Sequence, residues 1–352
     1  MNYHLTTILC VTLLACGVQT ETKQKVIDND KEVVCFVYHR FGDNRYPSTN
    51  IALETFKAHL QFLKENGFQV LTLSAAIDYL STNGPKQKTA VITIDDGYTS
   101  FYKNGLPILT KYSFPATLFI NTETVGGGDY MDWKDINSAI KLGIEIGNHT
   151  HSHAYFLNLP ETNRYEAFEQ EITKSQQLIN ENTGLTPQVF AYPYGEWDVK
   201  MKSIVKKLGF KGAAAQNSGV IDQGTDMMQI PRFPMAESFG DIKNFSSKAK
   251  MKALRVVSQS PNSPQFTDDI GTPTLKLTFD GTGLLLNQLQ CFIQGSECKT
   301  EVKEMENGIV QLTLSPSISI NNRRRTLYTI TVPDKNGQWH WYSHLWVNAV
   351  VK

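Results

Sequence analysis

The sequence has no excess of charge of either sign, no internal repeat and no long low-complexity segment. Its 34 lysine and arginine residues balance 34 aspartate and glutamate residues. Net charge therefore gives no reason to expect binding to nucleic acid or to an anionic membrane surface. We interpret the one basic run, residues 323–325, as a solvated turn. With 352 residues, of which 41% are hydrophobic, the chain has enough material for two globular domains.

The sequence also lacks an apolar run long enough to span a bilayer comfortably. Residues 5–15 are almost wholly apolar, which is about the length of a signal-peptide core. Residues 13–17, Leu-Leu-Ala-Cys-Gly, resemble a bacterial lipobox, in which the cysteine becomes the lipidated first residue. We therefore expect a lipoprotein signal peptide over residues 1–16, a lipid anchor on Cys16 and a tether over residues 17–31. An ordinary cleaved signal peptide is the alternative. Either way the protein is expected to be exported, and the lipobox predicts a bacterial membrane-anchored lipoprotein that faces the periplasm or the cell surface.

Only three cysteines follow this segment. An exported chain can keep disulfides, and Cys291 and Cys298 are close enough in the sequence to close a hairpin. Cys35 lies in an apolar run and is interpreted as a small core residue.

Strand-like and helix-like segments alternate through the first two thirds of the chain. Residues 33–38 form a buried-strand pattern, and residues 53–66 show helical spacing with Asn50 as the expected cap. Such alternation favours a parallel α/β sheet, open or closed into a barrel, and we expect this domain to span residues 32–250. Further strands are expected at 68–73, 90–94, 116–120, 144–146, 189–192, 213–215 and 228–230, and further helices at 105–112, 133–142, 163–183 and 199–208.

The last hundred residues change to a period of two. Residues 274–279, 309–314, 328–332 and part of 339–347 alternate, and turn dipeptides separate them. This pattern predicts a small antiparallel β-sandwich over residues 258–352, with its first part serving as a linker or an edge. Its aromatic residues could stack on sugars or could form the core and the domain interface; they are Trp339, Trp341, Tyr342 and Trp346.

Three polar motifs follow predicted strands, which is where α/β enzymes place their active groups. Asp95 and Asp96 leave one strand together, so that one carboxylate can bind a metal while the other handles a proton. Residues 149–153 contain three histidines, and imidazoles four residues apart can converge on one ion. Residues 190–195, Phe-Ala-Tyr-Pro-Tyr-Gly, form a rigid bend with N–H groups suited to an oxyanion. Taken singly, each motif is also compatible with a plain strand exit, surface loop or turn.

In order and spacing, these motifs resemble those of the NodB-type polysaccharide deacetylases, carbohydrate esterase family four. Residues 93–97 (Thr-Ile-Asp-Asp-Gly) match the family's Thr-Phe-Asp-Asp-Gly, and residues 149–153 match His-Ser/Thr-x-x-His. Residues 191–194 match Arg-x-Pro-Tyr except for the arginine. The resemblance covers about residues 33–237. It implies a distorted (β/α) barrel, followed in this chain by the β-sandwich, and a metal-dependent polysaccharide deacetylase activity.

The resemblance implies a role for each matched residue. Asp95 would be the general base, and Asp96, His149 and His153 would bind a divalent metal, usually zinc and sometimes cobalt or nickel. Three protein ligands leave an open coordination position, as a catalytic zinc site requires. The backbone N–H of Tyr194 would hold the oxyanion together with the metal.

The sequence departs from the family pattern at several positions. Position 191 is alanine where many members have an arginine that orients the base, and we hypothesise that Arg232 supplies this guanidinium. Asp132 belongs to an Asp-x-x-Asp-Trp sequence that precedes the third motif instead of following it, so we interpret it as a helix cap. His151 occupies a variable position and is interpreted as a loop residue.

The histidine that normally acts as general acid near the end of the domain is absent. His340 and His344 fall in predicted strands of the β domain. His39 ends the first predicted strand, and we assign it to the site as a substrate contact or an acid.

Three features resemble those of the exopolysaccharide branch of the family. They are the sequence Tyr-His-Arg-Phe at residues 38–41, the third motif without its arginine, and the expected lipid anchor. That branch removes acetyl groups from poly-N-acetylglucosamine. We therefore predict a polysaccharide N-deacetylase with this polymer as the candidate substrate, and exopolysaccharide export machinery as a candidate partner. The alternatives are an O-acetyl esterase acting on an acetylxylan-like glycan and a catalytically weak glycan-binding lipoprotein.

Overall fold

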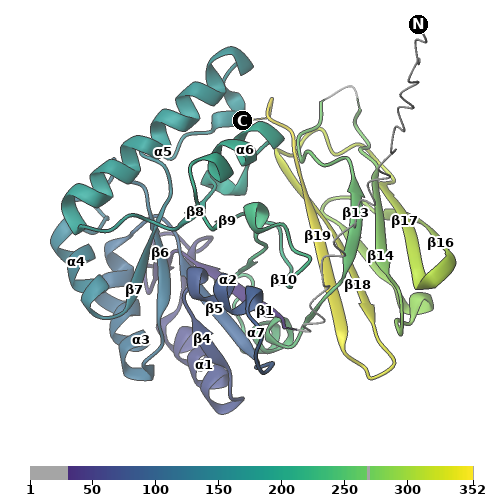
Figure 1. The fold of residues 1–352 in the computed structure, drawn as a ribbon, viewed down its shortest axis with the longest axis horizontal. Helices are drawn as coiled ribbons and strands as arrows, with labels where there is room; N and C mark the ends of the chain where they lie inside the picture. The colour runs from purple at the N-terminus through teal and green to yellow at the C-terminus, as the bar shows by residue number, and fades with distance from the viewer. Residues whose placement is uncertain (1–30, 268–269, 352) are drawn as a thin grey trace, which may run out of the picture.

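The computed structural model describes residues 31–267 and 270–351. The expected signal peptide, Cys16 and all but the last residue of the expected tether lie outside the described residues. The described chain forms an α/β unit, purple to teal in Figure 1, and a β unit that is green to yellow. No helix in the described ranges combines the length and the apolar character needed to cross a membrane.

The α/β unit is built around one nine-stranded sheet. Its strands are β1 (Val33–Tyr38), β4 (Gln69–Leu71), β5 (Thr89–Ile94), β6 (Ala116–Ile120), β7 (Ile144–Asn148), β8 (Val189–Ala191), β9 (Gly212–Ala214), β10 (Val220–Ile221) and β11 (Phe233–Pro234). The order is β10-β1-β5-β6-β7-β8-β9, with β4 beside β5 and β11 beside β1. All neighbours are parallel except β10, which is antiparallel to β1.

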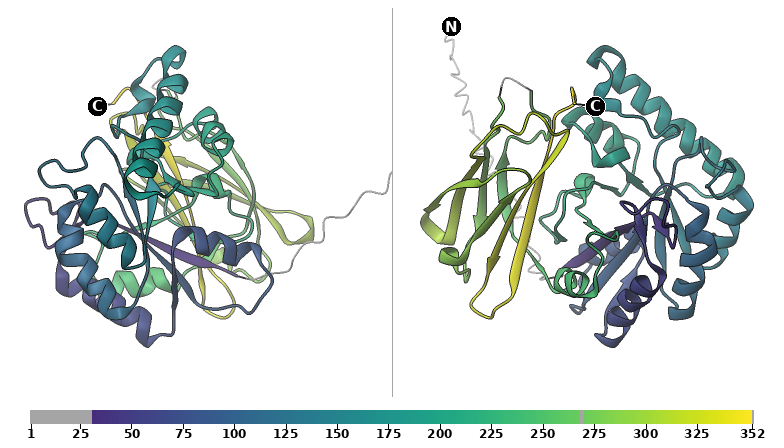
Figure 2. Two further views of the ribbon diagram at one scale, coloured as in Figure 1. Left: turned by 60° about the vertical axis from the view of Figure 1, so that its left-hand side comes forward. Right: turned by 180° about the vertical axis from the view of Figure 1, so that it is seen from behind.

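Helices cover the outside of this sheet, which curls into an incomplete barrel (Figures 1 and 2). They are α1 (Leu53–Glu65), α2 (Leu73–Ser81), α3 (Leu106–Tyr112), α4 (Trp133–Lys141), α5 (Glu161–Thr183), α6 (Val199–Lys207) and α7 (Ile242–Ala249). The distorted (β/α) barrel predicted from the sequence is thus confirmed. Because the strands are parallel, the loops that follow them meet at one edge of the sheet.

Several local predictions agree with the structure and others need correction. The side chain of Asp132 accepts a hydrogen bond from the backbone N–H of Asp135 and caps α4, as predicted. Asn50 does not cap α1, because it lies in the short strand β3 (Asn50–Ile51), which pairs with β2 (Arg40–Phe41). Helix α2 was not predicted. Of the strand predicted at 228–230, only Ile230 pairs, in a parallel bridge with Ala214, because a 3₁₀ turn, Met227–Gln229, occupies the rest.

The β unit consists of two four-stranded sheets that share one core. One sheet contains β12 (Lys252–Ala253), β19 (Trp339–Val347), β18 (Arg325–Pro333) and β15 (Gln290–Ile293), in that order. The other contains β13 (Val256–Ser260), β14 (Leu275–Asp280), β17 (Ile309–Pro316) and β16 (Cys298–Glu304). Alternate residues of β14 and β17 are buried between the sheets, which gives the sandwich that the period of two predicts.

A disulfide bond joins Cys291 to Cys298, so the predicted pairing is confirmed. Its setting differs from the predicted hairpin, because Cys291 lies in β15 and Cys298 in β16, which belong to different sheets. The bond therefore ties the two sheets together at one end of the sandwich. Cys35 is a free thiol and fully buried, as expected of a core residue.

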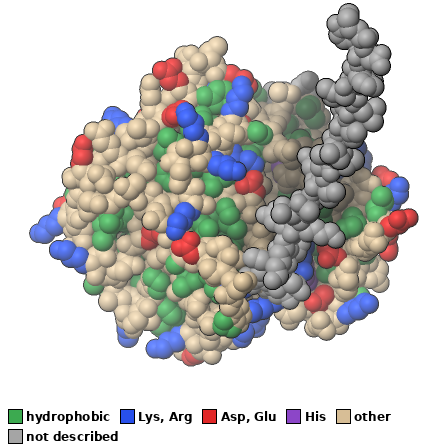
Figure 3. Space-filling model, in the orientation of Figure 1, with side chains coloured by type: hydrophobic (Ala, Val, Ile, Leu, Met, Phe, Trp, Pro, Cys, Tyr) green, Lys and Arg blue, Asp and Glu red, His purple; other side chains and the backbone are tan. Residues whose placement is uncertain are grey.

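The two units are in contact through β19 and the loops of the α/β unit. The indole N–H of Trp341 donates to the Ser218 hydroxyl, and its ring packs edge-on against Phe233. Trp346 is 2% exposed and lies in the sandwich core. These two aromatic residues therefore serve the interface and the core, and they are not exposed platforms for sugars. The face shown in Figure 3 carries positive and negative side chains intermixed.

Candidate active site

The first motif follows β5, whose six residues are all buried. Asp95 continues this strand, and its backbone N–H donates to the carbonyl of Tyr38 at the end of β1. Asp96 and Gly97 then take positive φ values of 73° and 75°, so that the chain turns sharply and the two adjacent carboxylates point to different places. Asp95 is fully buried, whereas Asp96 is partly exposed.

The second motif follows β7 in a loop that several side chains hold in place. The side-chain oxygen of Asn148 accepts from the backbone N–H of Thr150. The Glu171 carboxylate on α5 accepts from the backbone N–H groups of His151 and Ser152. These bonds fix the backbone on both sides of the turn, which brings the rings of His149 and His153 together.

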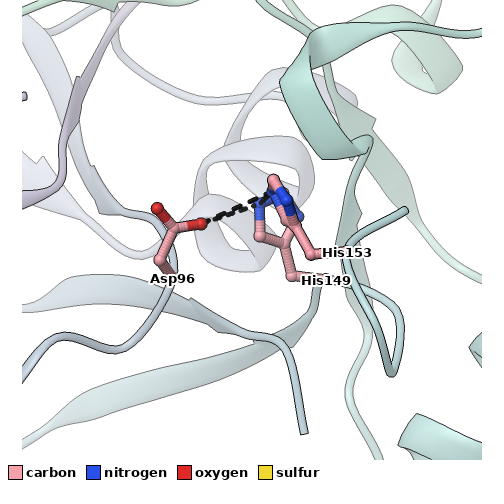
Figure 4. Close-up of side chains that lie close together, drawn as sticks. All are labelled: Asp96, His149 and His153. Atoms are coloured by element: carbon pink, nitrogen blue, oxygen red, sulfur yellow. Dashed lines mark hydrogen bonds and ion pairs between the residues drawn. The ribbon is translucent and has the colours of Figure 1, made fainter. Parts of the chain in front are cut away.

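Asp96, His149 and His153 point toward one another, as Figure 4 shows. The Nε2 atoms of the two histidines lie 3.1 Å apart. Each lies 3.5 Å from the same Asp96 oxygen, Oδ1. In a tetrahedral zinc site with metal–nitrogen bonds of about 2.1 Å, neighbouring ligand atoms are about 3.4 Å apart. The three atoms therefore have the spacing that one small divalent ion requires.

Hydrogen bonding and charge prepare these residues to bind a metal. The ring nitrogen Nδ1 of His149 donates to the carbonyl of Ala191 over 2.8 Å, which leaves Nε2 as the metal-facing lone pair. Burial and the neighbouring His149 lower the pKa of His153 to about 4, so this ring is neutral at pH 7. Burial raises the pKa of Asp96, but the nearby histidines outweigh this effect and lower the pKa overall.

Asp95 is paired with Arg232, the residue hypothesised to replace the missing arginine of the third motif. Arg232 Nη1 lies 2.7 Å from Asp95 Oδ1, and Nη2 lies 2.9 Å from Oδ2. The guanidinium also donates to the Thr93 hydroxyl and to the carbonyl of Ala215. Burial raises the pKa of Asp95, but the charges of Arg232 and His149 outweigh it and hold that pKa below its usual value.

The structure also places His39 and Tyr194 at this edge of the sheet. His39 follows β1, and its Nε2 lies 4.0 Å from Asp95 Oδ2. Tyr194 lies in a turn after β8, and its ring packs against those of His153 and Tyr155. All seven residues that the sequence assigned to the site are therefore brought together, although their catalytic roles stay predictions.

The remaining histidines in question lie elsewhere. His151 does not belong to the cluster of Asp96, His149 and His153. Its Nδ1 pairs with the Thr122 hydroxyl instead. His340 and His344 lie in β19 of the sandwich, as the alternation predicts.

Backbone strain is concentrated at this site. Among the described residues, six other than glycine have positive φ, and four of them are Asp96, Thr150, His153 and Tyr194. Such conformations cost free energy and persist only where the surroundings enforce them, most often at functional sites. Here they bend three separate loops toward one point.

One set of contacts at the site was missed. Residues 323–325 were interpreted as a solvated turn, but Arg324 pairs with the buried Glu196 through two bonds of 2.7 Å. Arg325 donates to the carbonyl of Tyr194 over 3.0 Å. The solvated-turn interpretation is therefore wrong for these two arginines. Only their adjacency in the sequence hinted at a role, because their partners lie about 130 residues earlier.

Comparison with known proteins agrees with this geometry. Residues 82–213 match the family model described as polysaccharide deacetylase. The chain contains a polysaccharide deacetylase domain. The matched residues include both carboxylates of the first motif, both metal-facing histidines and Tyr194.

Named relatives show which polysaccharide deacetylases this domain resembles. A Staphylococcus aureus poly-beta-1,6-N-acetyl-D-glucosamine N-deacetylase is 25% identical over 215 residues, covering 57% of this chain and 73% of the relative. The solved structure of IcaB from Ammonifex degensii is 25% identical with a TM-score of 0.56, covering 62% of this chain and 97% of that one. The Streptococcus pyogenes deacetylase PplD, at 20% identity and a TM-score of 0.57, covers 62% of this chain and 98% of its own and shows the same fold. The deacetylase domain of this chain is thus related to the poly-β-1,6-N-acetylglucosamine deacetylases.

Proposed function

We propose that this protein removes N-acetyl groups from an extracellular or periplasmic polysaccharide, with poly-β-1,6-N-acetylglucosamine as its substrate. The observation that carries the proposal is the convergence of Asp96, His149 and His153 beside the Asp95–Arg232 pair. The substrate is supported by the S. aureus relative, whose name states this polymer.

Asp96, His149 and His153 fit a divalent metal, and we propose zinc because two imidazoles and one carboxylate form a typical zinc ligand set. When bound, the ion supplies Lewis-acid polarisation of the acetamide carbonyl. Cobalt and nickel accept the same ligands.

Asp95 acts as the general base in this proposal. Its carboxylate accepts a proton from the water molecule that attacks the acetyl carbon. Arg232 holds both oxygens of that carboxylate, so the base is oriented as well as kept ionised before the reaction. The low pKa of Asp95 makes it a weak base, and orientation is therefore the larger part of its contribution.

Tyr194 and His39 complete the reaction. The backbone N–H of Tyr194, in its strained turn, stabilises the oxyanion that forms as water adds to the carbonyl. His39 lies 4.0 Å from Asp95, and we assign it the role of giving a proton to the leaving amine. The C–N bond then breaks, and acetate and the free amine of the sugar are released.

The place of action follows from the N-terminal sequence. We propose an exported lipoprotein anchored through Cys16, facing the periplasm or cell surface, where it meets the polymer beside its export machinery. Replacing Cys16 with serine is expected to abolish incorporation of a labelled fatty acid while leaving the purified soluble domain active. Fatty-acid labelling that persists in the variant contradicts the anchor.

The deciding experiment measures acetate released by zinc-loaded protein that lacks the first 19 residues. The substrates are β-1,6-N-acetylglucosamine oligomers, chitin oligomers, peptidoglycan and acetylxylan, and Asp95→Asn is the control. Release from the β-1,6 oligomers that disappears in the control is the expected result. Release from acetylxylan alone indicates an O-acetyl esterase. Glycan binding without any release indicates a binding protein.

A further inference from the structure

A cavity of about 630 Å³ beside the active site has walls from both units of the protein. One wall belongs to the deacetylase unit and the other to the β unit. Its chemically informative lining residues are His39, Phe239, Gln294, Asn322, Arg323 and Arg325. We refer to the last four, all from the β unit, as the arginine wall.

The arginine wall is connected to the catalytic residues at two points. Across the cavity, His39 lines the opposite wall and lies 4.0 Å from Asp95. On its own side, Arg325 donates to the carbonyl of Tyr194, whose ring packs on His153. A sugar bound in the active site therefore has neighbouring sugars of the same chain within reach of this wall.

The charges of the wall are only partly compensated. Arg324 also lines the cavity, but Glu196 neutralises it through two bonds of 2.7 Å. The carboxylate nearest to Arg325 is also that of Glu196, which already pairs with Arg324. Its oxygen Oε1 lies 4.0 Å from Arg325 Nε. Arg323 is exposed and forms no ion pair with the described residues. No carboxylate lines the cavity, so two guanidinium charges face the space where the glycan would lie.

Residues of the β-sandwich hold the arginine wall in position. Gly295 leaves room for Arg323, whose Cδ lies only 3.3 Å from the point where a Cβ on residue 295 would be. The side-chain oxygen of Gln294 accepts from the backbone N–H of Leu327, which leaves its amide nitrogen as a donor. The disulfide between Cys291 and Cys298 closes the loop that carries both residues.

We propose that the arginine wall is a subsite for a sugar next to the one being deacetylated, and that it selects neighbours that still carry their acetyl group. This inference rests on the proposed function. Guanidinium groups only donate hydrogen bonds, and an N-acetylated sugar offers carbonyl and hydroxyl oxygens as acceptors. A deacetylated sugar carries an ammonium group, which the two uncompensated guanidinium groups repel. The enzyme therefore disfavours deacetylation beside a unit that it has already processed.

The selection is tested first by binding, which does not depend on turnover. In metal-free protein, which keeps the Asp95–Arg232 pair intact, a fully acetylated β-1,6 pentamer is expected to bind about tenfold tighter than a pentamer containing glucosamine, at low salt and slightly acidic pH. Arg323→Glu in the same metal-free state is expected to remove or reverse this ratio, and Arg323→Lys to keep it. Lys299→Glu, an exposed charge change on β16 outside the cavity, is the matched control. Equal binding of the two pentamers to the parent protein, or a ratio unchanged by Arg323→Glu, overturns the inference.

The pattern of the products gives the second test. Wild-type protein is expected to leave acetylated units between deacetylated ones, and Arg323→Glu to produce contiguous deacetylated runs, as read by mass-spectrometric sequencing. The same pattern from both proteins overturns the inference. If wild-type protein releases no acetate, the proposed function fails, and the binding ratio still decides whether the wall discriminates.

Discussion

At the scale of single residues, the best defined feature of the site is the buried pair formed by Asp95 and Arg232. Arg232 is 0% exposed and contacts both carboxylate oxygens. Removing one partner of such a pair leaves an uncompensated buried charge and typically costs about 3–5 kcal/mol. The pair thus links the ionised state of the proposed base directly to the stability of the fold.

We expect Arg232→Ala to lower the rate of acetate release at least about a hundredfold and to destabilise the protein by about 3 kcal/mol. Arg232→Lys keeps the charge but loses the two-point contact with the carboxylate. Its activity is therefore expected to lie between that of wild-type protein and that of Arg232→Ala. Acetate release and urea unfolding measure the two effects.

The matched control for this prediction is Arg164→Ala. Arg164 forms another buried pair, with Asp198 at 3.1 Å, away from the metal-facing residues. Its loss is expected to cost similar stability while leaving the rate of the folded enzyme unchanged. Full activity in Arg232→Ala would remove Arg232 from the mechanism.

The metal-facing histidines offer a second test at the same scale. His153→Gln is expected to weaken zinc binding by at least about a hundredfold, because only two protein ligands remain. His151→Gln is the control, since its ring pairs with Thr122. Calorimetric titration of metal-free protein with Zn²⁺ measures the affinities. Equal zinc affinity in both variants would place the metal elsewhere.

At the scale of elements, the disulfide is notable because it crosses between sheets. β15 pairs only with β18, and β16 pairs only with β17, in the described structure. Cys291 and Cys298 therefore anchor two edge strands that otherwise belong to separate sheets. Edge strands are the least supported strands of a sheet, so a covalent link at this position holds the loop that carries Gln294 and Gly295.

Replacing both cysteines with serine is expected to destabilise the β unit by about 2 kcal/mol, the value expected for closing a loop of this length. The midpoint of urea unfolding, followed by tryptophan fluorescence, measures the change. Wild-type protein in reductant should match the double variant, and Cys35→Ala serves as a control for loss of a thiol. Identical midpoints with and without reductant would show that the bond does not contribute.

The sequence predicts most elements of the α/β unit because strands and helices there differ in period and are separated by glycine or by caps. Helix α2 was missed although its cap, Thr72, accepts from the N–H of Ala75, because only one residue separates it from β4. Strands β15 and β16 were not separated, because spacing along the chain cannot show which sheet a strand joins.

The site itself shows a similar division. Asp95, Asp96, His149 and His153 lie in compact motifs, so the sequence alone brings them to one edge of a parallel sheet. Arg232 could be proposed because position 191 is alanine where the family motif has an arginine, so another residue had to supply the guanidinium. Arg325 could not, because its contact with Tyr194 depends on how the two units pack. Local pattern carries no information about that packing.

At the scale of the whole molecule, each unit buries a histidine in its neutral form. His59 lies between the Tyr38 hydroxyl and the carbonyl of Gly240, and burial lowers its pKa to about 4. Burial likewise lowers the pKa of His344 to about 3. An unfolded histidine has a pKa of about 6.5, so below that pH the unfolded chain binds protons that the folded chain does not.

This difference predicts an acid-sensitive fold. Since the unfolded state binds more protons, the free energy of unfolding falls as the pH decreases from about 6.5 toward about 4. Each pKa unit corresponds to about 1.4 kcal/mol, so each histidine contributes roughly 3 kcal/mol across that window. The contribution is fully present above about pH 6.5. Urea unfolding measured at neutral pH and at mildly acidic pH is expected to show this loss in wild-type protein.

His344→Phe separates this effect from the titration of carboxylates. The Nε2 atom of His344 is buried without a hydrogen-bond partner among the described residues, and the ring packs edge-on against Trp346. Phenylalanine keeps the ring contact and removes the proton-binding group, so stability at neutral pH should change little. The loss of stability on acidification should then shrink by up to about 3 kcal/mol. An unchanged pH dependence in this variant would mean that His344 is not neutral and buried in the folded protein, and acid sensitivity would have to arise from the α/β unit alone.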